Sequence, residues 1–182
     1  MATTKHTLVA IVEDKPGVLN RMASLFRRRG FNIESIAVGH SELPHISRMT
    51  IVVDGTTTSV EQVRKQLDKI VDVIKVTDIS GDDIVARELA LIKVKATSST
   101  RSEIIQIVDI FRANIVGVIS DSVTIEVTGD EDKINSLIDL LRGFGIKEIA
   151  RTGRIAIARG GSSPIQPEEK TSKTHSKRQK SS

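Results

Sequence analysis

The residues best suited to bind a small molecule lie in one short stretch, Asp14-Lys15-Pro16-Gly17-Val18-Leu19-Asn20. Pro16 favours the first turn of a helix, where its missing N–H needs no partner, and Gly17 leaves the backbone open to a close neighbour. Because free amides at a helix start attract anions, we expect this turn to hold the carboxylate of a small amino acid. Asp14 would then bind the ammonium, and Asn32, at the start of the next strand, would add an amide contact. The spacing alone also fits an ordinary strand-to-helix turn.

Other kinds of reactive site find little support in the sequence. The four histidines, His6, His40, His45 and His175, are scattered without the spacing of metal ligands, and there is no cysteine. The chain contains no Gly-x-Ser-x-Gly motif and no glycine-rich phosphate loop. We therefore predict no catalytic residue, no metal site and no cofactor in this chain.

The basic charge belongs mostly to the C-terminal end. Residues 162–182 contain five basic and two acidic residues, whereas the preceding 161 contain 22 basic and 21 acidic ones. Recognition of RNA on a sheet depends on aromatic side chains, and the chain has no Trp, no Tyr and four Phe, of which only Phe31 lies near an expected strand edge. The basic run 27–29 suits a solvated helix end, where positive charge is favourable. We predict that the protein does not bind nucleic acid.

Hydrophobic periodicity predicts the same order of elements twice. In the first half the expected strands are 7–12, 33–39, 48–53 and 73–79, with helices at 18–29 and from 58 or 59 to 70. In the second half they are 89–94, 115–119, 123–127 and one or two strands within 146–157, with helices at 100–111 and 130–141. Capping boxes are expected at Thr58 or Ser59 and at Thr100. This order defines an α+β protein of two tandem ferredoxin-like βαββαβ domains.

The domain boundaries follow from the same pattern. We expect a first domain at residues 5–80, a linker at 81–86, a second domain at 87–160 and a disordered basic tail at 161–182. Each domain is small and gains by pairing with another sheet, so we expect oligomers. The chain has neither a long apolar run nor the apolar core of a signal peptide, which predicts a protein that is soluble and cytoplasmic and does not bind membranes.

Several motifs resemble the small, regulatory subunit of acetolactate synthase, a family whose N-terminal part is an ACT domain. The similar segments cover roughly residues 5 to 160. They are Asp-Lys-Pro-Gly-Val-Leu at 14–19, Arg-Arg-Gly-Phe-Asn-Ile-Glu-Ser at 28–35, Ser-Arg-Met-Thr-Ile at 47–51 and Glu-Ile-Ala-Arg-Thr-Gly at 148–153.

The resemblance implies a non-catalytic subunit that activates a thiamine diphosphate-dependent large subunit and confers feedback inhibition by valine. It implies that thiamine diphosphate, FAD and Mg reside in that partner, and that ACT domains pair as a homodimer with the effector between them. The matching effector-binding residues are Asp14, Lys15, Pro16, Gly17, Val18, Leu19, Asn20, Asn32 and Ile33. Many members carry asparagine where this chain has Asp14. A second hypothesis is a free-standing amino-acid-responsive regulator that acts on other partners or on nucleic acid.

Overall fold

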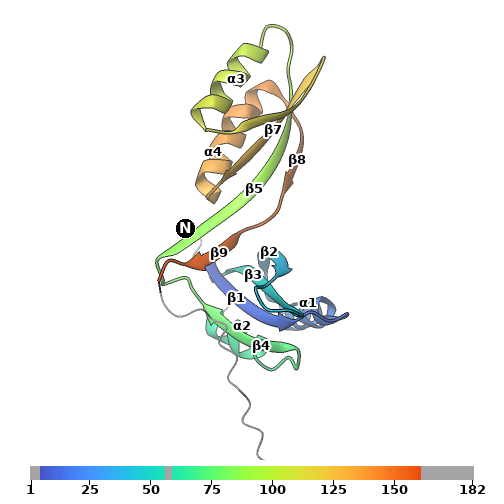
Figure 1. Cartoon of the computed structure of the whole chain (residues 1–182), viewed down its shortest axis with the longest axis vertical. Helices are drawn as coiled ribbons and strands as arrows, with labels where there is room; N and C mark the ends of the chain where they lie inside the picture. The colour runs from blue at the N-terminus through green and yellow to red at the C-terminus, as the bar shows by residue number, and fades with distance from the viewer. Residues whose placement is uncertain (1–4, 56–58, 161–182) are drawn as a thin grey trace, which may run out of the picture.

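The computed structural model describes residues 5–55 and 59–160, which form two units joined by one long strand (Figure 1). The first unit forms a sheet in the order β2-β3-β1-β4. Its elements are β1 (Lys5–Glu13), α1 (Val18–Arg29), β2 (Ile33–His40), β3 (Ile46–Asp54), α2 (Val60–Leu67) and β4 (Val73–Asp78). Strands β3 and β4 are antiparallel to β1, and β3 is also antiparallel to β2. Strands β1 and β2 therefore run in the same direction.

The second unit repeats this arrangement with the order β6-β7-β5-β8. Its elements are β5 (Ile84–Lys95), α3 (Arg101–Ile110), β6 (Asn114–Ile119), β7 (Ser122–Gly129), α4 (Glu131–Leu141), a 3-10 turn (Arg142–Phe144), β8 (Ile146–Arg151) and β9 (Ile155–Ala158). Helices α3 and α4 cover one face of this sheet (Figure 1). The expected pair of βαββαβ units is confirmed.

Each unit has its own apolar core between its sheet and its helices. In the first, the predicted stripe of α1 is buried against the sheet through Val18, Met22, Leu25 and Phe26. In the second, α3 and α4 bury an equivalent set: Ile104, Val108, Ile134, Leu137, Ile138 and Leu141. The alternation of these aliphatic residues at three- and four-residue spacing is what makes each helix amphipathic.

The two units meet where β5 pairs with β9, a pairing that the sequence did not predict. Strand β5 begins at Ile84, within the segment expected to be a linker, and its first residues pair with β9. Ala156 of β9 is buried with Val9, Ile11 and Ile79 on the face of the first sheet that carries no helix. The paired strands β5 and β9 therefore cover part of the outer face of the first sheet and fix one unit on the other.

The two expected helix caps that lie among the described residues are not formed, and a cap forms at another helix instead. At α4 the Asp130 carboxylate accepts from the Lys133 N–H at 2.9 Å and caps the helix, which the sequence analysis did not predict. Ser59 and Thr100 stand at the N-caps of α2 and α3 but give no side-chain cap, and Thr100 instead accepts from the Thr97 N–H at 3.0 Å. Thr58 and the expected tail at 161–182 lie outside the described residues.

Among the described residues, no helix is both long and apolar enough to cross a membrane. The same part of the chain brings no three His, Cys, Asp or Glu side chains together in an arrangement that would hold a metal ion.

Candidate functional site

The turn between β1 and α1 is held in place by backbone contacts on both sides. The Glu13 N–H donates to the Asp72 carbonyl at 2.9 Å, and the Asp14 N–H donates to the His45 carbonyl at 2.8 Å. Arg21, one turn into α1, pairs through Nε with the buried Asp72 carboxylate at 2.6 Å. Asp72 therefore joins the end of β1 to α1 and positions the turn between them.

Gly17 is the N-cap of α1 and has a φ of 88°, in the left-handed region that side chains with a Cβ rarely adopt. No side chain caps the helix, and its first turn has no acidic residue. Within the described residues, the N–H groups of Gly17, Leu19 and Asn20 have no hydrogen-bond acceptor. Three free amides at the positive end of a helix dipole make this turn suitable for an anion.

Asp14 and Lys15 flank these amides on the exposed side of the turn. The Asp14 carboxylate lies 3.4 Å from Nδ1 of His40, and Lys15 donates to Glu13 at 2.6 Å. That hydrogen bond raises the pKa of the Lys15 ammonium. Pro16, Gly17, Leu19 and Asn20 are exposed, while Val18 is buried in the core. The free amides are thus open to solvent beside a half-exposed carboxylate.

The structure does not bring Asn32 and Ile33 to this turn. Both lie at the start of β2, whereas His40, the last residue of β2, contacts Asp14. The eight residues of β2 span about 25 Å at 3.3 Å each. Helix α1 returns the chain to the starting end of β1, so β2 begins at the opposite end of the sheet from the turn. Within one chain, Asn32 therefore lies away from the turn, and its contact with an effector stays a prediction.

Strand β2 is an edge strand, and its outer hydrogen-bonding side has no partner strand in the described residues. It exposes Ile36 by 39% and Val38 by 46%, and the nearby helix α1 exposes Leu19 by 50%. Ile36 and Val38 pair in register with Ile51 and Met49, which belong to the helix-covered core. An apolar, unpaired edge thus runs from the turn to Asn32, and such edges readily pair with another strand.

The other end of β2 contacts the second unit through groups that the sequence did not single out as an interface. The Arg154 N–H donates to Ser35 Oγ at 3.0 Å, and its guanidinium donates to Glu131 at 2.8 Å. Lys5 donates to Glu131 at 2.6 Å and pairs with Glu34 at 2.9 Å. The hydrogen bond from Lys5 lowers the pKa of the Glu131 carboxyl and raises that of Lys5. These ion pairs link β1, β2 and the start of α4.

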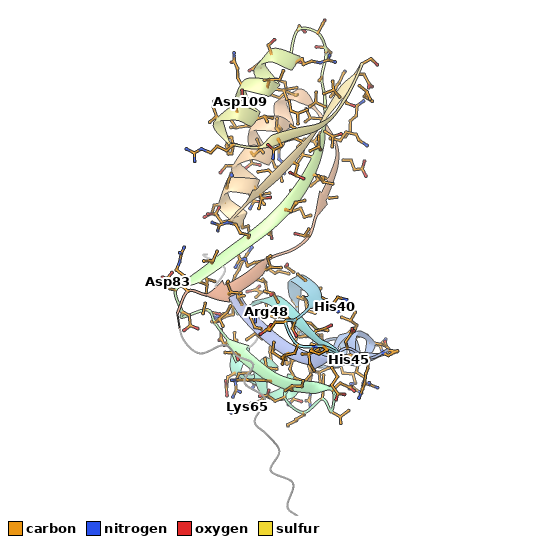
Figure 2. All side chains as sticks on the ribbon, viewed as in Figure 1. His40, His45, Arg48, Lys65, Asp83 and Asp109 are labelled. Atoms are coloured by element: carbon orange, nitrogen blue, oxygen red, sulfur yellow. The ribbon has the colours of Figure 1, made fainter. Side chains whose placement is uncertain are left out.

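Figure 2 shows His40 and His45 at the end of the first sheet that carries the turn, with Arg48 nearer to the second unit. Arg48 reaches across to β9, where its Nη2 donates to the Ala156 carbonyl at 2.8 Å. Burial lowers the pKa of its guanidinium.

Each of the two units matches a known family model. Residues 8–75 match the family model described as "AHAS small subunit-like ACT domain". Residues 87–160 match the family model described as "Small subunit of acetolactate synthase". A probable acetolactate synthase small subunit of Archaeoglobus fulgidus is 58% identical over 156 residues, or 86% of this chain and 98% of the relative. The acetolactate synthase small subunit of Bacillus subtilis is 53% identical over 158 residues, or 86% and 91%.

Among solved structures, the acetolactate synthase small subunit of Thermotoga maritima aligns with a TM-score of 0.79 and 43% identity, over 87% of this chain and 99% of that one. The fold and its exposed helix-start turn define an ACT-domain protein, a class that binds amino-acid effectors. More specifically, the chain belongs to the family of acetolactate synthase small subunits. It is a regulatory subunit of branched-chain amino acid biosynthesis, and the catalytic activity resides in the large subunit.

Proposed function

We propose that this subunit activates the acetolactate synthase large subunit and makes the complex sensitive to inhibition by valine. The observation that carries the proposal is the set of free amides at Gly17, Leu19 and Asn20, next to an unpaired apolar strand edge. The amides would hold the valine carboxylate, and Asp14 would hold its ammonium. Leu19, which is exposed, would contact its branched side chain.

A homodimer would complete this site. If β2 pairs with β2 of a second copy across a two-fold axis, the two strands run antiparallel. The Ile33 end of one strand then lies beside the His40 end of the other. This arrangement brings Asn32 and Ile33 of one copy to the turn of its partner, which a single chain cannot do. The nine proposed effector-binding residues would thus form two equivalent sites from two copies.

Inhibition requires valine to bind two states of the complex unequally, because a ligand with equal affinity for both shifts neither. The test is an activity assay of the large subunit alone and of the reconstituted complex across a valine titration. We expect the complex to be more active without valine and to lose activity as valine rises. Unchanged activity on adding the subunit would contradict the proposal and favour the free-standing regulator.

The dimer predicts a specific effect of charge on the β2 edge. Ile36→Lys should shift the protein from dimer to monomer in sedimentation velocity, because burying an unpaired ammonium in an apolar interface is costly. The matched control is Ile74→Lys on β4, the opposite edge of the same sheet, where Ile74 is 56% exposed. A dimer that survives Ile36→Lys but dissociates in Ile74→Lys would place the interface on β4 instead.

A further inference from the structure

A cleft of about 350 Å³ lies between β2 and β3 of the first unit and the paired strands β5 and β9. None of residues 14–20 lines it, although His40, which does, lies 3.4 Å from the Asp14 carboxylate, so the cleft borders the turn. Val85, Ile155 and Ile157 are among its apolar lining residues. Its volume is at the small end of the range for ligand sites. Its lining, apolar with a few polar groups, is also typical of such sites.

Arg48 is the first of two guanidinium groups in this cleft. It extends from β3, is partly buried and donates from Nη2 to the Ala156 carbonyl. Among the described residues, no carboxylate lies within ion-pair distance of it, although buried arginines are normally paired. A guanidinium has five N–H donors, and this contact leaves most of them available.

Arg87 is the second, and it enters from β5, where it stands opposite Ile155 of β9. Its Nη1 donates to the Ala86 carbonyl at 2.7 Å, and again no carboxylate of the described chain pairs with it. Other arginines near the junction of the two units do have such partners: Arg151 pairs with Glu88, Arg154 with Glu131, and Arg159 with Asp83. The two guanidinium groups that line this cleft are the exceptions in that comparison.

The cleft residues also determine which anion fits. Among the described residues, no aspartate or glutamate lines the cleft, so the ammonium of an amino acid would find no counter-charge in its lining. The apolar wall favours an aliphatic chain over a phosphate or a sugar, because a polar group against it would lose its hydrogen bonds to water. We propose that this cleft binds a short aliphatic carboxylate that carries no α-amino group.

Such a ligand would contact both units at once. Its carboxylate would pair with Arg48 of the first unit and Arg87 of the second, and its chain would lie along β9. Binding would therefore strengthen the contact between the paired strands β5 and β9 and the first sheet. The site goes beyond the valine site proposed above and does not depend on it.

The test uses isovalerate, a branched aliphatic carboxylate, added to the ¹⁵N-labelled full chain and followed by NMR. We expect saturable shifts of the amides of Ala37, Val38 and residues 155–157, with those of residues 14–20 unchanged. Arg87→Gln should weaken isovalerate binding about tenfold, as expected for one charge-assisted hydrogen bond. The matched control is Arg159→Gln, an exposed arginine just beyond β9, which should leave the affinity unchanged.

Isovaleramide has the same shape without the charge, and we expect it to give no saturable shifts in this cleft. Three results would overturn the proposal. They are the absence of saturable shifts with isovalerate, equal affinity in Arg87→Gln, and equal binding of isovaleramide. Shifts of the same amides that depend on protein concentration without ligand would assign the cleft to a second copy of the chain. In a separate titration with valine, the valine site is judged by the amide shifts of residues 14–20, whereas this cleft is judged by those of residues 155–157 with isovalerate.

Discussion

Gly17→Asp is expected to raise the valine concentration for half-inhibition by about a hundredfold or more, while the subunit still assembles with and activates the large subunit. The new carboxylate would stand among the free amides of α1 and repel the carboxylate of valine. Two like charges about 4 Å apart near a protein surface repel by about 4 kcal/mol, and every 1.4 kcal/mol is tenfold in affinity. The measurement is a valine titration of the reconstituted complex.

The substitution itself should be tolerated by the fold. Gly17 has a φ of 88°, which costs a side chain about 1 kcal/mol, but Asp and Asn visit this region more readily than most residues. A Cβ at this position would meet only Nη1 of Arg21, at 3.9 Å. Gly17→Asn is therefore the matched control, since it adds the same volume without charge and should weaken inhibition far less. Unchanged half-inhibition in Gly17→Asp would reject the turn as the valine site.

The local features of this site were predictable because they depend on neighbouring residues. Pro16 and Gly17 indicate a helix start, and the spacing of Val18, Met22 and Phe26 places one face of α1 in the core. The position of Asn32 relative to the turn depends instead on the direction of β2. A strand-helix-strand crossover usually makes its two strands parallel, and that rule already separates the end of β1 from the start of β2.

The contact between the two units could not be read from the sequence pattern. Ile155–Ala158 is four residues long and pairs with the first residues of β5, about 70 positions earlier in the chain. Short strands of this kind are stabilised by the strands they pair with, and neither hydrophobic periodicity nor strand propensity identifies the pairing strand. The same holds for Thr100, whose hydroxyl accepts from Thr97 rather than capping α3, because two local hydrogen bonds compete for one side chain.

Gly153→Ala is expected to lower the free energy of unfolding by about 2 kcal/mol or more, through strain at the contact between the units. Gly153 has a φ of 80°, and a Cβ there would lie 2.7 Å from Ser35 Oγ and 3.3 Å from the Ile36 carbonyl oxygen. The left-handed conformation costs about 1–2 kcal/mol and the close contacts add to it. Urea unfolding gives the difference. Gly143→Ala, with open space around its Cβ and no positive φ, is the control and should be nearly neutral.

The steric part of the destabilisation by Gly153→Ala depends on Ser35, whose Oγ would lie nearest to the new Cβ. Its hydroxyl can turn away from the new methyl group, but it would then lose the hydrogen bond from the Arg154 N–H, at 3.0 Å. In a double-mutant cycle, Ser35→Ala should cost about 1 kcal/mol alone, yet Ser35→Ala with Gly153→Ala should cost less than the sum, because the clash with Oγ is gone. Faster amide exchange at Arg154 in Gly153→Ala would show the same displacement directly. Strict additivity in the cycle would mean that backbone strain at residue 153, and not contact with β2, sets the cost.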